Sequence, residues 1–181
     1  MKTDIAAKIE IPENVEININ KGVISVKGSK GTITKKLLSP KIKISVKDKN
    51  ILIESKKGTR REKKMIGTFK AHIRNMIKGA SEGFIYRLKI CSSHFPMTAS
   101  LEGKNFAVKN FLGESIARTL EIKEGVNIKI EGADILVESA DKELAGQTAA
   151  SIEKLCVIKS RDKRIFQDGI WIVEKAGKEI K

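Results

Sequence analysis

Apolar and polar residues alternate along four short stretches in the first half of this 181-residue chain. The stretches are residues 15–19, 24–26, 42–46 and 51–53, and turns rich in Gly, Asn and Lys separate them. Alternation with a period of two is typical of antiparallel strands that are buried on one face. The glycines in these turns match no phosphate-binding pattern, so they indicate hairpins. The pattern therefore predicts a strand-rich meander.

The period changes from about Arg60 to Ala80, where apolar residues recur at helical spacing. The stripe consists of Met65, Ile66, Phe69, Ile73, Met76 and Ile77. It predicts an amphipathic helix that packs on the sheet, because a small sheet cannot bury its apolar face alone. Gly79 is the expected C-terminal stop of this helix. Residues 84–91 are then predicted to form a strand that closes the first unit.

The chain contains an internal duplication. Residues 50–55 (NILIES) return almost unchanged as residues 134–139 (DILVES), which lie 84 positions later. The helical residues repeat at an offset of 79, so that Ile73 corresponds to Ile152. The same unit therefore occurs twice in the sequence, and the first copy carries a basic insertion before its helix.

The second copy follows the same plan. Its helix is expected from an N-cap at Asp141 to about Val157. Its strands are expected near residues 97–101, 105–110, 113–121, 126–130 and 135–137. We predict an α+β fold of two tandem duplicated domains, residues 1–83 and residues 84–181, each a small, mainly antiparallel sheet packed by one helix.

The net charge of +14 and the pI near 9.8 predict a polyanionic partner, in the first place nucleic acid. Residues 1–83 hold 20 basic and 8 acidic side chains, residues 84–158 hold 9 and 10, and residues 159–181 hold 7 and 4. Lysines that only solvate exposed strands explain part of this excess, but not the difference between the copies. Aromatic residues are only 4% of the chain, which favours contacts to phosphates and riboses of double-helical nucleic acid over stacking on single strands.

Two basic segments are the candidate nucleic-acid-binding sites. The first is the insertion, expected in the loop and first helical turn of the first copy, with Lys56, Lys57, Arg60, Arg61, Lys63 and Lys64. The second is the tail after the second helix, with Lys159, Arg161, Lys163 and Arg164. Cations beside the positive end of a helix dipole are mutually unfavourable without an anion, and phosphate is the natural one. In the tail, Phe166 and Trp171 are expected to anchor the segment, and Asp162 and Asp168 to orient the arginines.

No catalytic or metal-binding pattern accompanies this charge. The histidines His72 and His94 and the cysteines Cys91 and Cys156 match no zinc spacing, and no nucleophile with a base stands out. We therefore expect no enzymatic activity, no cofactor, no metal site and no small-molecule substrate. The cysteine usage favours a reducing, cytoplasmic compartment. Apolar runs of at most four residues are too short for a bilayer span, so we expect no membrane partner.

Three longer motifs are more specific. They are the strand from Tyr86 into SHFP (93–96), VKNFLGE (108–114) with Arg118, and RDKRIFQDGIWIVEK (161–175). Together with the duplication, they resemble the large-subunit ribosomal protein L-six family in its archaeal and eukaryotic form, called L-nine in eukaryotes. The resemblance implies two similar α+β domains docked on large-subunit rRNA beside the translation-factor site and the base of the sarcin-ricin stem. It also implies neighbouring ribosomal proteins as partners and the tail as an RNA-contacting segment.

The resulting interpretation is a structural constituent of the large ribosomal subunit. An RNA-modifying or other RNA-processing factor outside the ribosome is the alternative, and it would require a cofactor cradle or a general base. A module that binds only proteins is a second rival, and the charge of the first copy argues against it. The charge counts favour the first copy as the main RNA site, whereas the family resemblance favours the tail.

Overall fold

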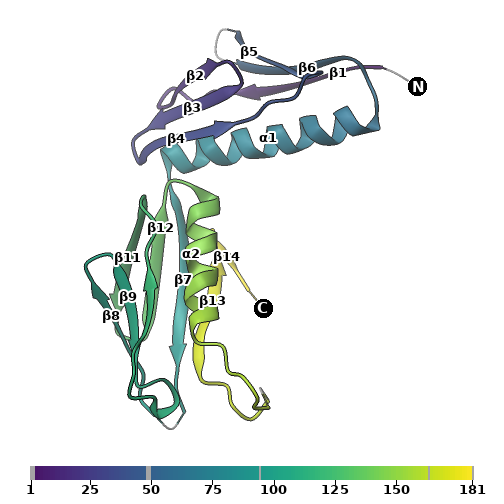
Figure 1. Cartoon of the computed structure of the whole chain (residues 1–181). Coiled ribbons are helices and arrows are strands. Elements are labelled where there is room, and N and C mark those ends of the chain that lie inside the picture. Colours follow the sequence, from purple (N-terminus) through teal and green to yellow (C-terminus); the bar gives the residue numbers. More distant parts are fainter. Residues whose placement is uncertain (1–2, 48–49, 94, 163, 181) are drawn as a thin grey trace. The chain divides into compact units, whose positions relative to one another are not determined.

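The computed structural model describes residues 3–47, 50–93, 95–162 and 164–180. The chain divides into two compact units, unit 1 (residues 1–83) and unit 2 (residues 84–181), and each is described by itself. In each unit a helix packs against antiparallel strands (Figure 1). The predicted α+β class is confirmed. It differs in one detail, because the strands of each unit form two sheets where the alternation had suggested one.

Unit 1 combines two small sheets with one covering helix. Its described elements are β1 (Thr3–Glu10), β2 (Glu16–Asn20), β3 (Val23–Gly28), β4 (Gly31–Lys36), β5 (Lys43–Lys47), β6 (Asn50–Gly58) and α1 (Arg60–Ser81). The strand orders are β1-β6-β5 and β2-β3-β4. Helix α1 contacts strands of both sheets, and its predicted apolar stripe is buried from Ile66 to Ile77. The strand β1 is absent from the sequence-based prediction, because Ala7 is too small to mark the alternation between Ile5 and Ile9.

The C-terminus of α1 lies two residues beyond the predicted stop. Gly79 is buried inside the helix, and Gly83 is the residue with the left-handed φ of 79°. The turn between β3 and β4 explains the extension, since it donates hydrogen bonds to the last carbonyl groups. The Lys30 N–H donates to Ala80 O (3.0 Å), and Ser29 Oγ donates to Ser81 O (2.9 Å). Helix ends persist where such partners satisfy their free carbonyls.

Unit 2 contains a larger sheet and a smaller one. Its described elements are β7 (Phe84–Cys91), β8 (Thr98–Glu102), β9 (Asn105–Lys109), the short 3₁₀ helix η1 (Phe111–Gly113), β10 (Arg118–Glu121), β11 (Val126–Glu131), β12 (Asp134–Ser139), α2 (Lys142–Leu155), β13 (Gly169–Lys175) and β14 (Lys178–Glu179). The strand orders are β11-β12-β7-β13-β14 and β10-β9-β8. Asp141 is the N-cap of α2, as predicted, and its side chain accepts a hydrogen bond from the Glu143 N–H.

The strand β7 corrects one prediction: it does not close unit 1. It lies in the middle of the large sheet of unit 2, between β12 and β13. Its alternation places Phe84, Tyr86 and Leu88 in the core of unit 2, next to Ile135 and Val137. Period-two alternation shows which face of a strand is buried but not which partner strand it joins, so the sequence left this choice open.

The strand registers make the duplication visible in three dimensions. Ile9 of β1 is paired with Ile51 of β6, and Leu88 of β7 is paired with Ile135 of β12. Ile51 and Ile135 are 84 residues apart, the offset of the repeated strand. The strand β7 is therefore the counterpart of β1, at an offset of 79. Unit 2 then adds β13 and β14 on the far side of β7, within the segment after α2 that the sequence predicts to be a basic tail.

The VKNFLGE motif forms a turn that Arg118 ties to α2. Arg118 Nε and Nη2 donate to the Glu114 carboxylate (2.8 and 2.6 Å), and these hydrogen bonds lower the pKa of Glu114. Arg118 Nη1 donates to the carbonyl oxygen of Leu155 (2.7 Å) in the last turn of α2. The guanidinium carbon lies 4.3 Å from the centre of the Phe111 ring. This motif therefore stabilises unit 2 internally.

Independent folding of the two units is our first prediction. Because both partners of β7 lie in unit 2, a cut between Gly83 and Phe84 separates no strand from its sheet. Fragments 1–83 and 84–181 should therefore each unfold cooperatively in urea when expressed alone. Fragment 93–181 is the matched control, since it lacks the central strand β7 and should not fold. A non-cooperative transition in either of the first two fragments would contradict the prediction.

A pair of equivalent glycines should respond differently to alanine. A Cβ added at Gly67 of α1 meets nothing within 4 Å, whereas one at Gly146 of α2 lies 3.1 Å from the Tyr86 hydroxyl. Ala7, the counterpart of Tyr86, leaves this space open in unit 1. Gly67→Ala should raise the free energy of unfolding by about 0.5–1 kcal/mol through helix propensity. Gly146→Ala should gain less or lose stability, and urea unfolding of both variants checks this. Equal gains in the free energy of unfolding would show that the Tyr86 hydroxyl can shift without an energetic cost.

Candidate nucleic-acid interface

The first basic segment, called here the helix-start cluster, spans a strand end and the first turns of α1. It comprises Lys56, Lys57, Arg60, Arg61, Lys63 and Lys64. The first two residues correct the prediction of a loop, because β6 stays paired with β1 as far as Gly58, opposite Thr3. An irregularity in the register between Thr3 and Ile5 accommodates this pairing. The insertion of the first copy has thus lengthened a strand and a helix.

Local geometry fixes the path of the chain through the cluster. Lys57 has a left-handed φ of 50°, and its N–H donates to Asp4 Oδ1 (2.8 Å). Gly58 is buried against Ile5, where a Cβ would lie 2.9 Å from the Ile5 side chain. Thr59 then caps α1 in an extended conformation. These contacts fix the backbone conformation, so the cationic side chains extend from defined backbone positions.

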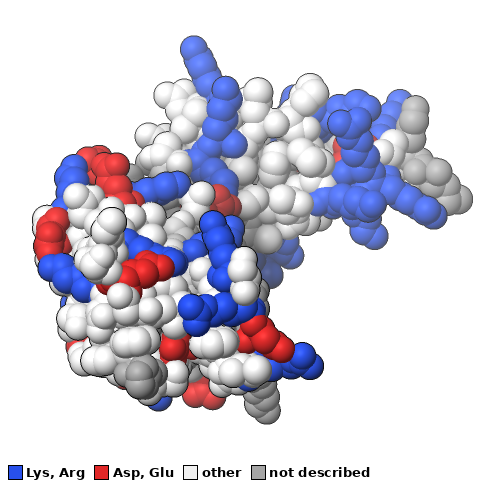
Figure 2. All heavy atoms as spheres, turned by 60° about the horizontal axis from the view of Figure 1, so that its bottom comes forward, with Lys and Arg blue, Asp and Glu red and all other residues white. Residues whose placement is uncertain are grey.

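The six side chains of the helix-start cluster are all exposed. Within the described ranges, none of them forms an ion pair with an acidic side chain. Four of them lie in the first turns of α1, beside the positive end of the helix dipole, which adds to their mutual repulsion. Figure 2 shows Lys and Arg side chains gathered at the end of unit 1 where β1 and α1 begin. The cluster is therefore a site of unneutralised positive potential.

Glu62, the acidic residue within this segment, is turned away from the cluster. Its Oε2 accepts hydrogen bonds from the Thr59 N–H (2.7 Å) and the Thr59 hydroxyl, which completes a capping box. The hydrogen bonds from the Thr59 side chain and backbone lower the pKa of Glu62 from 4.5 to about 2. Lys41 Nζ lies 3.6 Å from its other oxygen. Glu62 thus stabilises the helix end and leaves the six cations available to an external anion.

Glu62 gives the fold a specific acid dependence. A carboxylate whose pKa is lower in the folded state stabilises the protein above its ordinary pKa, and this contribution disappears as pH falls through the folded value. Wild-type protein should therefore lose melting temperature between pH 4.5 and about pH 2 more steeply than Glu62→Gln. The variant should be less stable at pH 7 and equal to wild type near pH 2. Glu16→Gln, an exposed acid on β2, should follow the wild-type curve. Parallel curves for Glu62→Gln and wild type would contradict this role.

The tail between α2 and β13 is folded by its own backbone. The N–H groups of Ile165 and Phe166 donate to Asp162 O (3.1 and 2.9 Å). The Asp162 carboxylate accepts from the Arg164 N–H (2.9 Å) and from Arg164 Nη2 (2.8 Å), and these bonds lower the pKa of Asp162. The Arg164 side chain is 90% exposed, so Asp162 orients it without covering it. The predicted role of Asp162 agrees with this geometry.

Aromatic and acidic residues join the tail to unit 2. Phe166 packs against the core of unit 2, and the Arg161 guanidinium carbon lies 4.8 Å from the centre of its ring. Trp171 lies on β13, where it is 44% exposed and its Nε1 donates to Gln167 O (3.1 Å). Asp168 does not orient an arginine, contrary to expectation. It is buried, and its Oδ1 accepts from the Ser93 N–H (2.5 Å), which ties the tail to the loop after β7.

The structure distributes the predicted residues between the two units. The helix-start cluster belongs to unit 1, and Lys159, Arg161 and Arg164 are exposed on the tail of unit 2. Lys163 and His94 lie outside the described residues. Sequence reasoning did not foresee Asp4, Lys41 and Ser93 as partners that position these segments. No signal in the sequence marks them, because each contact joins residues far apart in the chain.

The described residues contain neither a metal-binding cluster nor a helix able to span a membrane. No group of three or more His, Cys, Asp or Glu side chains there could hold a metal ion. Among the same residues, no helix combines the length and apolar character that crossing a bilayer requires. Burial raises the pKa of the Cys156 thiol to about 11, so this thiol is protonated at neutral pH and suits packing rather than nucleophilic chemistry.

Comparison with known proteins identifies the family. The sequence model of the family described as "Ribosomal protein L6" matches residues 11–83 and residues 95–169. The two matches fall one in each unit, and together they cover most of the chain. The chain belongs to the ribosomal protein L6 family. The resemblance inferred from the motifs and the duplication is thereby confirmed.

Curated relatives from three archaea match nearly the full length of the chain. A protein of Methanococcus vannielii is 44% identical over 176 residues, which is 97% of both chains. One of Nanoarchaeum equitans is 45% identical over 184 residues, 97% of this chain and 96% of the relative. One of Methanosarcina mazei is 43% identical over 176 residues, 97% of this chain and all of the relative. Each is named "Large ribosomal subunit protein uL6".

Proposed function

We propose that this protein is a structural constituent of the large ribosomal subunit and binds rRNA there. The observation that carries the proposal is the similarity, over 97% of the chain, to archaeal proteins named as large ribosomal subunit proteins. The helix-start cluster supports it, since its exposed cations pair with no described acidic side chain, and so do the exposed Lys159, Arg161 and Arg164 of the tail, because rRNA is the polyanion of that particle. The protein contributes binding and architecture, and it performs no catalytic step.

In this proposal the two basic segments contact phosphates and riboses rather than base edges. Side chains on a helix end and on an ordered turn are presented at fixed spacing, so little conformational entropy is lost when RNA binds. The guanidinium groups of Arg161 and Arg164 suit bidentate contacts to phosphate oxygens. The low aromatic content agrees with recognition of folded, double-helical RNA by its backbone.

The family resemblance supports a finer location. We place the protein beside the translation-factor site, near the base of the sarcin-ricin stem, with neighbouring ribosomal proteins as further partners. Crosslinking of a photoreactive group at Arg164→Cys to rRNA, followed by mapping of the crosslinked nucleotides, tests this location. Crosslinks confined to another region of the large-subunit rRNA would overturn the location and leave subunit membership intact.

Sedimentation tests the function itself. A tagged copy expressed in its host should migrate with the large-subunit peak of a sucrose gradient, and should remain there after a wash that removes loosely bound factors. Its absence from that peak would end the ribosomal proposal. Turnover of RNA by purified protein with common cofactors would instead support the RNA-modifying alternative.

A further inference from the structure

In the described part of unit 1, one sheet edge has no partner strand at the position where unit 2 holds an additional strand. We propose that the edge of β1, beside the C-terminal half of α1, binds an extended acidic and apolar segment of another protein as an added strand. The inference does not depend on the ribosomal proposal, because it follows from comparing the two units.

In unit 2 this place is filled by β13. The strand pairs antiparallel with β7, from Gly169 opposite Cys91 to Lys175 opposite Tyr86. It also packs against α2, and its Ile170 is only 1% exposed. Arg87 Nε lies 4.0 Å from Glu174 Oε2 across the two strands. The strand β13 thus contributes backbone pairing, an apolar anchor and an ion pair.

The duplication identifies the matching positions in unit 1. At the offset of 79, residues 86–89 of β7 correspond to residues 7–10 at the end of β1, and residues 90–91 correspond to Ile11 and Pro12 just after it. Lys8 corresponds to Arg87, and Arg74 of α1 corresponds to Glu153 of α2. In the part of unit 1 that the structure describes, β1 pairs with β6 alone and lies at the edge of its sheet. An edge strand presents unpaired N–H and C=O groups, which are a template for another strand.

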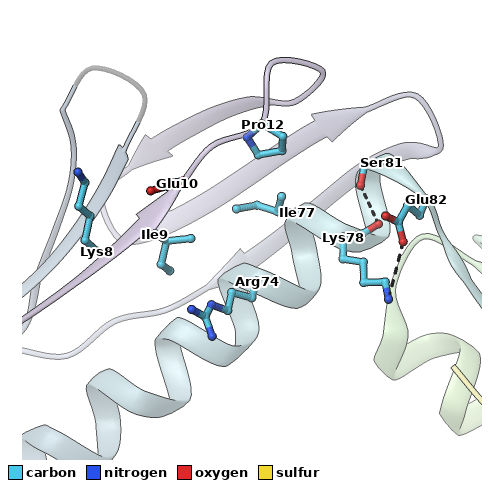
Figure 3. A pocket seen from close by; sticks show the side chains of 9 residues that line it. All are labelled: Lys8, Ile9, Glu10, Pro12, Arg74, Ile77, Lys78, Ser81 and Glu82. Carbon is cyan, nitrogen blue, oxygen red and sulfur yellow. Dashed lines mark hydrogen bonds and ion pairs between the residues drawn. The ribbon is translucent and has the colours of Figure 1, made fainter. Parts of the chain in front are cut away.

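A hollow of about 680 Å³ lies along this edge. Its lining residues are Lys8, Ile9, Glu10 and Pro12 from β1 and the turn after it, and Arg74, Ile77, Lys78, Ser81 and Glu82 from α1 and its cap (Figure 3). The apolar side chains of Ile9 and Ile77, both largely buried, form its inner part. Ile9 is the counterpart of Leu88, against which β13 places Ile172. An apolar side chain of the added strand would occupy the equivalent position opposite Ile9.

The charges of the hollow favour an acidic occupant: Lys78 pairs with Glu82 (3.7 Å), and the remaining charged residues are Lys8 and Arg74 against Glu10. Lys8 and Arg74 are exposed, and among described residues neither forms an ion pair. In unit 2, Glu153 Oε1 lies 3.5 Å from the Ile172 N–H that donates to it, whereas unit 1 offers the Arg74 guanidinium at that position. An acidic residue opposite Lys8 would reproduce the Arg87–Glu174 pair, and a second one would meet Arg74. Backbone pairing together with an apolar floor favours a peptide over RNA, since a phosphate backbone uses neither.

The experiment uses the full chain, labelled with ¹⁵N, and a synthetic peptide as the probe. The peptide copies residues 169–175 with Trp171→Thr and Lys175→Glu, and both of its ends are blocked. Amide shifts should change in residues 7–11 and 74–82, with antiparallel contacts between peptide and β1. The double variant Lys8→Glu with Arg74→Glu should bind about tenfold or more weakly, because both cations are reversed. Lys43→Glu with Lys47→Glu, on the opposite edge strand β5, is the matched control and should bind like wild type.

Two further probes separate strand addition from other modes of binding. The same peptide N-methylated on alternate residues keeps its side chains but cannot pair along the edge, so it should not bind. Equal binding of that peptide, shifts centred on β5, or no shifts at millimolar peptide would overturn the proposal. The proposal would also fail if a short RNA duplex shifted these amide signals while the peptide did not.

Self-association of the chain that the double variant abolishes would assign the edge to a second copy instead. Sedimentation with the large subunit is unaffected by any of these outcomes, so the two proposals fail separately.

Discussion

Replacement of all six cations of the helix-start cluster by glutamine is expected to weaken rRNA binding by roughly a thousandfold at physiological salt. Each phosphate contact contributes about 0.7–0.9 to the slope of log K against log salt concentration, so the slope should fall by about four to five if all six make contact. The isolated protein should keep or raise its melting temperature, because repulsion beside the helix dipole is relieved. Filter binding to an rRNA fragment at several salt concentrations, with thermal melting in parallel, measures both effects.

A matched variant separates position from net charge. It replaces six exposed lysines on the strands and turns of unit 1, namely Lys21, Lys27, Lys30, Lys36, Lys43 and Lys47, by glutamine. This variant has the same net charge but keeps the helix-start cluster, so it should retain most of the wild-type slope. Equal losses in both variants would show that only overall charge matters. A clear loss of thermal stability without loss of binding in the first variant would show that the cluster serves the fold.

Alanine at Lys159, Arg161, Lys163 and Arg164 is expected to reduce the salt slope by about three. Binding should weaken almost uniformly across RNA sequences, because these residues contact the backbone. Trp171→Ala should weaken binding with a smaller change in slope, since its indole holds the Gln167 carbonyl and helps to order the tail. The same filter-binding series measures both variants.

The tail variant also decides between the two candidate sites. If the quadruple alanine variant keeps the parent's salt dependence, the tail is not an RNA site, and the helix-start cluster carries the affinity. Asp162→Asn is a useful companion. It removes the charge that orients Arg164 without removing a cation, so it should change affinity modestly and leave the slope nearly unchanged.

The sequence by itself determined the features that depend on local pattern. Alternation located most strands, helical spacing located α1 and α2, and the repeated 50–55 stretch established the duplication. The N-cap at Asp141 was also readable, because a cap depends on neighbours within one turn. The uneven charge of the two copies and the family motifs required no structure either.

Only the tertiary structure decided which distant segments meet. The strand β7 could have joined either unit from its alternation, and long-range pairing with β12 and β13 settled the choice. Likewise, Asp168 was expected to face the arginines but is turned to the Ser93 N–H, and Glu62 is turned to Thr59 rather than to the cations around it. The free edge of β1 was recognised only by comparing β1 with its counterpart β7, whose equivalent edge is paired with β13. In each case several partners were chemically acceptable, and packing of residues far apart in the chain selected one.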